Sequence, residues 1–318
     1  MFPGQGAQYL GMCSDAINKF DYVKDLWEKS SDAIKVDLIK MVKDGPKELL
    51  SLTENTQPLL LVSAVSYAKI IENEVGIKGS VFAGHSLGEY SALVASGRID
   101  LSDAVNIVRK RGQFMQSAVP VGMGAMAAII GLDKAKIDSM CKNISSDGKN
   151  IVEIANYNGH VQTVISGLTE SVGLAMSVLM EMGGKAIKLP VSAPFHCSLM
   201  KKAAEDLKEY IDRLEVKNNS SIILPNIDPK FYTEYNKEFL LQQIYSVVKW
   251  TDTIQEAYNN GVKTFIDIGP SKTLAGIAKK MFEKQVDEQL KIVNFDSSNG
   301  GNIEEDIKAF GNNLFLKS

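Results

Sequence analysis

The sequence predicts a mixed α/β protein in which a small βαββαβ unit interrupts a larger α/β region. Short apolar runs typical of buried strands alternate with stretches of helical periodicity along most of the chain. A glycine-rich joint at residues 122–124 begins a segment whose strand and helix patterns follow the order βαββαβ. The 318 residues, of which 45% are hydrophobic, are enough to form a sizeable core.

Before the joint, strand and helix patterns alternate. Helical periodicity covers residues 57–74, a short buried strand covers 81–83, and helices cover 87–96 and 102–119, the last with Ser102 as its N-cap. The chain opens abruptly at residues 1–4, so we expect that an upstream strand or a targeting segment is absent from this sequence.

The inserted unit spans residues 122–190, with strands at 125–130, 151–155, 162–166 and 185–189 and helices at 134–143 and 170–182. This order is that of a ferredoxin-like unit, which we expect to fold as a small domain. The large domain then comprises residues 1–121 and 191–318. Its second part contains expected helices at 199–214, 238–248 and 251–259, strands at 222–225, 264–268 and 291–294, a helix after Ser271 and a terminal helix.

Composition and charge argue against several classes of protein. The net charge of -3 and the isoelectric point near 5.8 do not favour nucleic acid or anionic membrane as a partner. Cys13, Cys141 and Cys197 are widely spaced, which supports neither a disulfide framework nor a zinc site. The longest apolar run is too short to span a bilayer. We expect a soluble protein in a reducing compartment.

The most informative motif is Gly84-His85-Ser86-Leu87-Gly88, which lies between a strand pattern and a helix pattern. In a nucleophile elbow, the serine occupies a strained strand-to-helix turn, and the flanking glycines keep side chains away from its hydroxyl. The five-residue pattern is weak evidence alone, so the flanking elements carry the prediction. Ser86 is the candidate nucleophile.

A serine nucleophile needs a base, and the sequence contains three histidines. His85 is adjacent to Ser86 around a sharp turn, so a packing or hydrogen-bonding role is expected for it. His160 lies in an expected hairpin loop of the inserted unit. His196 precedes a helix in a loop from which a side chain can cross a cleft, and it is the candidate base. A histidine that only caps local structure fits its position equally well.

Arg111 lies on the apolar face of the helix predicted at 102–119, whereas Arg109 and Lys110 project away from it. Burial of a guanidinium without an anion is costly. Arg111 should therefore pair with an internal carboxylate, which is the commoner outcome in proteins, or with a carboxylate of the substrate, which it could select and orient through a bidentate contact.

The loop at residues 2–8 is bracketed by glycines and could supply a backbone N–H to an oxyanion, beside the N–H of Leu87. A tight turn without chemistry fits the same pattern. The sequence contains no phosphate-binding glycine motif, and its histidines lack metal-ligand spacing. We therefore expect no metal and no other cofactor.

Five ordered segments of the chain together resemble the malonyl-CoA:acyl-carrier-protein transacylase family. They are residues 2–6, 84–90, 109–116 with Arg111-Gly112, 124–131 and 190–197, and residues 243–250 and 267–270 are similar to the family's closing segments. The resemblance covers nearly the whole chain. Ser246, Val247 and Lys249 depart from the residues usual in the family, which leaves local packing near Trp250 open.

The resemblance implies an α/β-hydrolase-like large domain with an inserted ferredoxin-like domain. It also implies that a malonyl group is transferred from malonyl-CoA to the phosphopantetheine thiol of acyl carrier protein. Chain length favours a free-standing enzyme of type II fatty-acid synthesis. We expect it to be a monomer in a bacterial cytoplasm, or in a plastid or mitochondrial interior if a targeting segment was removed. The implied roles are Ser86 as nucleophile, His196 as general base, Arg111 as the ligand of the malonyl carboxylate, Gln5 and Leu87 as the oxyanion hole, Gln243 as the active-site glutamine and Phe195 as the bulky residue that disfavours branched acyl groups.

In that family, a main-chain carbonyl near the glutamine orients the histidine, so no acidic partner is expected. Two alternatives remain open at this stage. A serine thioesterase or esterase would use the same elbow and pass the acyl group to water. A non-catalytic interaction module would tolerate loss of Ser86, His196 or Arg111, yet all three are present.

Overall fold

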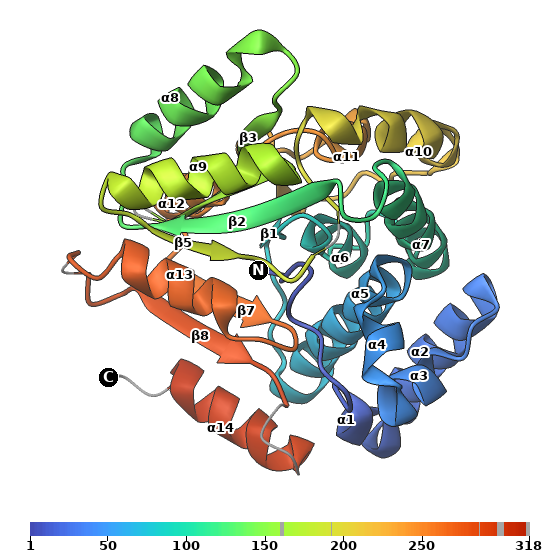
Figure 1. The fold of residues 1–318 in the computed structure, drawn as a ribbon. Coiled ribbons are helices and arrows are strands. Elements are labelled where there is room, and N and C mark those ends of the chain that lie inside the picture. The colour runs from blue at the N-terminus through green and yellow to red at the C-terminus, as the bar shows by residue number, and fades with distance from the viewer. Residues whose placement is uncertain (160–161, 192, 286, 298–301, 316–318) are drawn as a thin grey trace.

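The computed structural model describes residues 1–159, 162–191, 193–285, 287–297 and 302–315 (Figure 1). Parallel strands surrounded by helices form one part of the chain, and a four-stranded antiparallel sheet forms another. The chain is therefore a mixed α/β protein, as the sequence predicts.

Two short pairs of parallel strands are joined through the amino terminus. β1 (Val81–Ala83) pairs with β6 (Ile222–Leu224), and β7 (Thr264–Ile268) pairs with β8 (Lys291–Phe295). Phe2 forms a parallel bridge to Gly84, and Met1 exchanges backbone hydrogen bonds with β7. Because the first two residues lie between β1 and β7, the loop that follows them and the loop that follows β1 leave the same edge of the sheet.

Helices cover these strands. The first part of the chain contributes α1 (Ser14–Lys19), α2 (Asp21–Ile34), α3 (Leu38–Asp44), α4 (Lys47–Ser51), α5 (Thr53–Ile70), α6 (Gly88–Ala95) and α7 (Leu101–Ser117). The last part contributes α10 (Lys201–Arg213), α11 (Glu238–Gln242), α12 (Trp250–Asn259), α13 (Thr273–Met281) and α14 (Ile303–Phe315). The sequence predicts no helix or strand before residue 57. In the structure, α1 to α4 and the start of α5 lie there.

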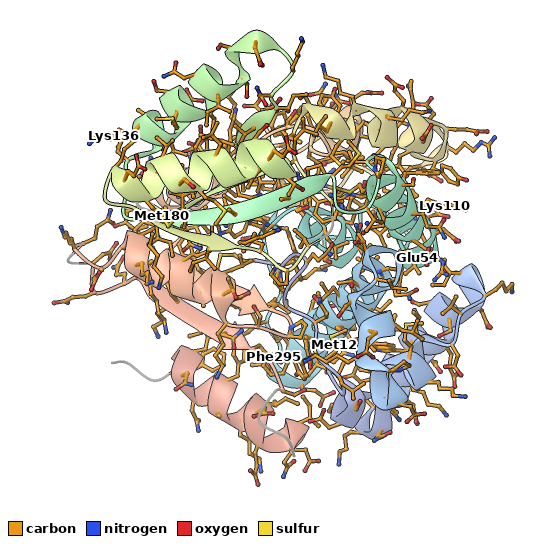
Figure 2. The ribbon with its side chains drawn as sticks, viewed as in Figure 1. Met12, Glu54, Lys110, Lys136, Met180 and Phe295 are labelled. Carbon is orange, nitrogen blue, oxygen red and sulfur yellow. The ribbon has the colours of Figure 1, made fainter. Side chains whose placement is uncertain are left out.

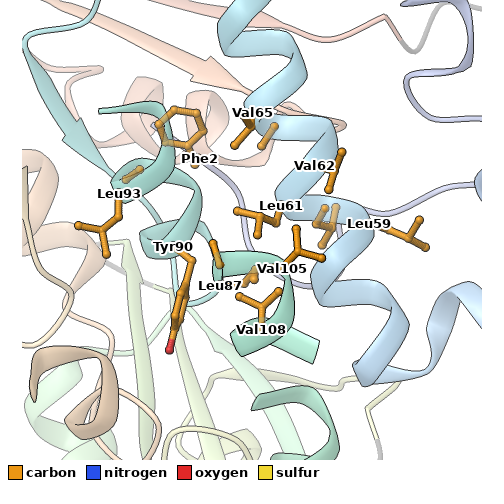
Figure 3. Close-up of a cluster of buried hydrophobic side chains, with 14 of the residues drawn as sticks. Phe2, Leu59, Leu61, Val62, Val65, Leu87, Tyr90, Leu93, Val105 and Val108 are labelled. Atoms are coloured by element: carbon orange, nitrogen blue, oxygen red, sulfur yellow. The ribbon is translucent and has the colours of Figure 1, made fainter. Parts of the chain in front are cut away.

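A core of aliphatic and aromatic side chains forms where α5, α6 and α7 meet (Figure 3). Leu61 of α5 and Val105 of α7 belong to this core together with Leu87, the residue that follows Ser86. Leu87 is 1% exposed, and full burial of such a side chain stabilises the fold by about 2 kcal/mol. Packing of Leu87 therefore holds the backbone of the elbow against the core.

The antiparallel sheet has the strand order β3-β4-β2-β5. Its strands are β2 (Gly124–Ile130), β3 (Val152–Gly159), β4 (Gln162–Leu168) and β5 (Lys185–Lys188), and the helices α8 (Lys134–Ile144) and α9 (Thr169–Glu181) complete the order βαββαβ. The sheet and the two helices bury a separate apolar cluster that includes Ile129, Ile137, Ile165 and Leu179.

Several expected helices differ from those observed. The helix expected at 57–74 begins at Thr53 and passes into a π-helical turn at Ile71–Val75. α7 begins at Leu101, and its cap is Asp100, whose side chain accepts from the N–H of Ser102. The helix expected at 199–214 begins with a 3-10 turn at Ser198–Met200. The helix expected at 238–248 ends at Gln242 because the carbonyls of the next two residues are turned toward His196.

An apolar cavity of about 760 Å³ lies between β1 and β7, beside Met1 and Phe2. Ser86, Arg111 and His196 are not among the described residues that line it. In the described ranges, no helix is long and apolar enough to cross a membrane, and no group of three or more His, Cys, Asp or Glu side chains could hold a metal ion.

Candidate active site

Ser86 lies in a sharp turn between β1 and α6 with a positive φ of 53°. A Cβ at Gly84 would lie 1.8 Å from the carbonyl oxygen of Gly88, and one at Gly88 would lie 2.1 Å from the carbonyl oxygen of Phe2. Neither position can carry a side chain, so both glycines are needed for the close approach of these backbones. The strand–turn–helix context of the predicted elbow is confirmed.

His196 is the histidine that reaches Ser86. Its Nε2 lies 2.7 Å from Ser86 Oγ, and its Nδ1 lies 2.7 Å from the carbonyl oxygen of Gln243. A carbonyl only accepts hydrogen bonds, so Nδ1 carries the proton and Nε2 is left to accept from the serine hydroxyl. His196 also has a positive φ, 61°, and its N–H donates to the carbonyl of Ile244.

Burial and charge keep this histidine neutral. Desolvation, assisted by the nearby positive charge of Arg111, lowers the pKa of His196 from 6.5 to about 3. A neutral imidazole is the form that can take a proton. At neutral pH, the pair can therefore move a proton from Ser86 to His196.

Arg111 is 1% exposed and points toward Ser86. Its Nη2 donates to Ser86 Oγ at 3.1 Å and to Gln243 Oε1 at 2.8 Å, and its Nη1 donates to Gln57 Oε1 at 2.8 Å. These partners are neutral, and the described residues give Arg111 no salt bridge and its Nε no partner. Lys110, by contrast, lies at the outer side of α7 (Figure 2). The inward direction predicted for Arg111 is confirmed.

Gln243 links the groups around the serine. Its side-chain oxygen accepts from Arg111, its main-chain oxygen accepts from His196, and its Nε2 donates to Glu89 Oε2 at 2.7 Å and to the carbonyl of Ser86 at 3.2 Å. Gln243 is fully buried. It is positioned at the end of α11, where the chain leaves the helix.

Glu89 and Asn226 also belong to the site, although neither is among the site residues predicted from the sequence. Asn226 follows β6, accepts from the N–H of Ser86 at 2.6 Å and donates to the carbonyl of Gly84 at 2.6 Å. Its own N–H donates to Glu89 Oε2. Glu89 is fully buried on α6, and desolvation raises its pKa to about 7. A carboxyl group within the mainly apolar segment 87–93 is expected to be buried, so the sequence marks Glu89 in the same way as it marks Arg111 on the apolar face of its helix.

The remaining predicted site residues lie nearby. Gln5 is half-buried in the loop after Phe2, and its Nε2 lies 3.4 Å from Thr53 Oγ1. The described residues provide no hydrogen-bond partner for the N–H of Leu87. Phe195 is 6% exposed and precedes His196 in the same loop. The oxyanion and selectivity roles of these three residues stay predictions.

His85 does not reach the serine hydroxyl. Its Nε2 hydrogen-bonds Asn158 of β3 at 2.9 Å, and its ring lies edge-on to Trp250, with 5.6 Å between the ring centroids. This is the packing and hydrogen-bonding role that the sequence suggested. His160 lies outside the described residues.

Known proteins match the chain over nearly its full length. The acyl transferase domain family matches residues 1–311. The malonyl CoA-acyl carrier protein transacylase of Bacillus subtilis is 42% identical over 284 residues, covering 88% of this chain and 89% of the relative. The chain belongs to the malonyl-CoA:acyl-carrier-protein transacylase family of acyltransferases.

Solved structures of this transacylase family share the fold. The transacylase of Coxiella burnetii is 38% identical, with a TM-score of 0.89, over 97% of this chain and 95% of that one. A malonyl-transacylase in complex with a type II polyketide synthase acyl-carrier protein is 38% identical, with a TM-score of 0.85, over 92% and 93% of the two chains. The resemblance predicted from the sequence is confirmed.

Proposed function

We propose that this chain transfers the malonyl group of malonyl-CoA to the phosphopantetheine thiol of an acyl carrier protein, through an ester on Ser86, in type II fatty-acid synthesis. Its relatives are named malonyl CoA-acyl carrier protein transacylases. The observation that carries the proposal is the buried guanidinium of Arg111, which lies 3.1 Å from Ser86 Oγ and contacts neutral groups. A substrate carboxylate would give the guanidinium the directly paired anion that the described residues do not provide.

In the first half-reaction, Ser86 Oγ attacks the thioester carbonyl carbon while His196 Nε2 takes the hydroxyl proton. The tetrahedral intermediate collapses, the carbon–sulfur bond breaks, and the coenzyme A sulfur takes the proton from His196. The products are coenzyme A and a malonyl ester of Ser86. The 2.7 Å contact between Oγ and Nε2 supports this transfer.

In the second half-reaction, His196 takes the proton of the carrier's thiol as its sulfur attacks the ester carbonyl carbon. The carbon–oxygen bond to Ser86 breaks, and the serine oxygen recovers the proton from His196. Malonyl-acyl carrier protein leaves. No metal or other cofactor is proposed, because side chains of this chain handle each proton and the acyl group.

The developing oxyanion needs donors, and we assign this role to the backbone N–H groups of Leu87 and Gln5. The N–H of Ser86 is occupied by Asn226 Oδ1 at 2.6 Å, so it is not the donor. Loss of one donor from such a pair costs on the order of a hundredfold in rate. Phe195, buried beside His196, is proposed to disfavour branched acyl groups.

We further propose that residues 122–190 form a ferredoxin-like domain inserted into an α/β-hydrolase-like domain of residues 1–121 and 191–318. The antiparallel order β3-β4-β2-β5 and the parallel pairs elsewhere support this division. A bacterial cytoplasm is the proposed location, since the relatives from Bacillus subtilis and Escherichia coli are bacterial proteins, and a monomer is the proposed form.

Mass spectrometry after incubation with malonyl-CoA tests the proposal. We expect wild-type protein to gain one malonyl group on Ser86, to release it to a carrier thiol and to release it slowly to water. Ser86→Ala should gain none. Malonylation of Ser86→Ala at the wild-type level would exclude Ser86 as nucleophile, and faster release to water than to the carrier would favour a thioesterase.

A further inference from the structure

Glu89 is a fully buried carboxyl group without a salt bridge in the described part of the chain. Its side chain accepts three hydrogen bonds, from the hydroxyl of Tyr235, from the N–H of Asn226 at 3.2 Å and from Gln243 Nε2 at 2.7 Å. Removing a carboxyl group from water costs several kcal/mol, which these donors offset in part. Such a group at 0% exposure needs an explanation beyond packing.

The amide of Gln243 is the group that connects Glu89 to the site. An amide can turn over and exchange its oxygen and nitrogen, so its neighbours decide which atom faces the guanidinium of Arg111. Glu89 Oε2 already accepts from the N–H of Asn226, so it is the acceptor oxygen of the carboxyl group, and Gln243 Nε2 lies against it. The amide oxygen is thereby directed at Arg111 Nη2, 2.8 Å away.

We propose that Glu89 is a positioning residue for acyl transfer: by accepting from Gln243, it fixes the amide that holds Arg111 beside Ser86. The turned-over amide would direct an N–H at the guanidinium, two donors would face each other, and Arg111 would lose one of its three partners. The inference rests on the proposed function, in which Arg111 binds the malonyl carboxylate.

Glu89 positions the amide of Gln243 through the location of its acceptor oxygen rather than through its negative charge. Glu89→Gln keeps an oxygen at the same distance along the side chain but removes the charge. Glu89→Asp keeps the charge but withdraws the oxygens by one methylene, ~1.5 Å. The two substitutions therefore separate the two explanations.

The measurement is the second-order rate of Ser86 acylation with malonyl-CoA and with acetyl-CoA, which lacks the distal carboxylate. We expect Glu89→Gln to keep the malonyl-to-acetyl rate ratio within about twofold of wild type, and Glu89→Asp to lower it by about tenfold or more, the cost of losing a hydrogen bond to a charged group. Tyr235→Phe is the matched control, because it removes another hydrogen bond to Glu89 and leaves Gln243 its acceptor.

An unchanged ratio in Glu89→Asp, with a loss of thermal stability like that of Tyr235→Phe, would make Glu89 a structural residue only. The reverse order, with Glu89→Gln impaired and Glu89→Asp normal, would assign the effect to charge and overturn the inference. Wild-type protein that fails to acylate Ser86 would instead refute the proposed function.

Discussion

The region of parallel strands and the antiparallel sheet differ in the side chains that they bury. Glu89, Arg98, Arg111, His196 and Asp267 are buried in the first region, whereas the described part of residues 122–190 buries no charged side chain and no histidine. Its cluster is made of Ala, Ile, Val, Leu and Cys side chains. Ser86, His196 and Arg111 thus lie in the region where hydrogen-bond networks hold polar groups out of water. The antiparallel sheet contributes Asn158, which contacts His85.

After the loss of Ser86 or His196 themselves, the largest functional effect is expected at Arg111. Arg111→Ala should lower the rate of malonyl transfer by about a hundredfold or more, because a desolvated contact between a guanidinium and a carboxylate is lost. Acetyl transfer should persist or rise. Acylation rates with the two thioesters measure this, and an unchanged preference for malonyl would refute the role of Arg111.

A smaller effect is expected at Asn226, which touches the elbow but not the acyl group. Asn226→Ala leaves the N–H of Ser86 and the carbonyl of Gly84 without their partner, so we expect about a tenfold loss of acylation rate and about 2 kcal/mol of stability. Asn226→Asp keeps the acceptor but places a carboxylate oxygen against the carbonyl of Gly84, so it should lose at least as much stability as Asn226→Ala. Wild-type rates in both variants would show that acylation does not depend on the hydrogen bonds between Asn226 and the backbone of the elbow.

In the antiparallel sheet, a substitution is expected to lower stability without lowering the rate of acylation. Ile137→Ala removes a fully buried side chain of α8 and should cost about 2–4 kcal/mol in unfolding free energy while the folded enzyme keeps its rate within about twofold. Leu61→Ala in α5, which removes a fully buried side chain from the core that contains Leu87, is the matched control and should lower both stability and rate. Denaturant unfolding and acylation kinetics distinguish the two, and an equal loss of rate would remove the functional contrast between the regions.

The smallest expected effect is that of mild acid on rate. His196 has a pKa of about 3, so it stays an available base and the acylation rate should be nearly constant between about pH 8 and pH 5. Glu89 titrates near pH 7, but its protonated form still offers an acceptor oxygen to Gln243. A rate that falls with a midpoint near 6.5 would indicate a solvated histidine.

The same lowered pKa affects stability. On unfolding, His196 regains its ordinary pKa of 6.5 and takes up a proton below that pH. Its contribution to stability is therefore complete above pH 6.5 and is lost progressively as the pH falls toward 3. Urea unfolding at a series of pH values, with His196→Gln as the control, measures this contribution.

The sequence predicts those parts of the site that leave a local pattern. Glycines on both sides of Ser86 identify the elbow, and the phase of one helix places Arg111 inward. Asn226 leaves no such pattern, because its partners are about 140 residues away along the chain and pairing of β6 with β1 brings them together. The end of α11 at Gln242 was also missed, since a tertiary contact with His196 decides where that helix stops.

The proton on His196 Nδ1 is held by the main-chain carbonyl of Gln243. Every residue type has that oxygen, so no substitution at position 243 deletes the orienting acceptor itself. A saturation screen should therefore find a serine and a histidine that cannot be replaced, and no third position that behaves like the acid of a catalytic triad. To disturb this part of the machinery, a substitution must move the backbone, and insertions at the end of α11 are the changes that would do so.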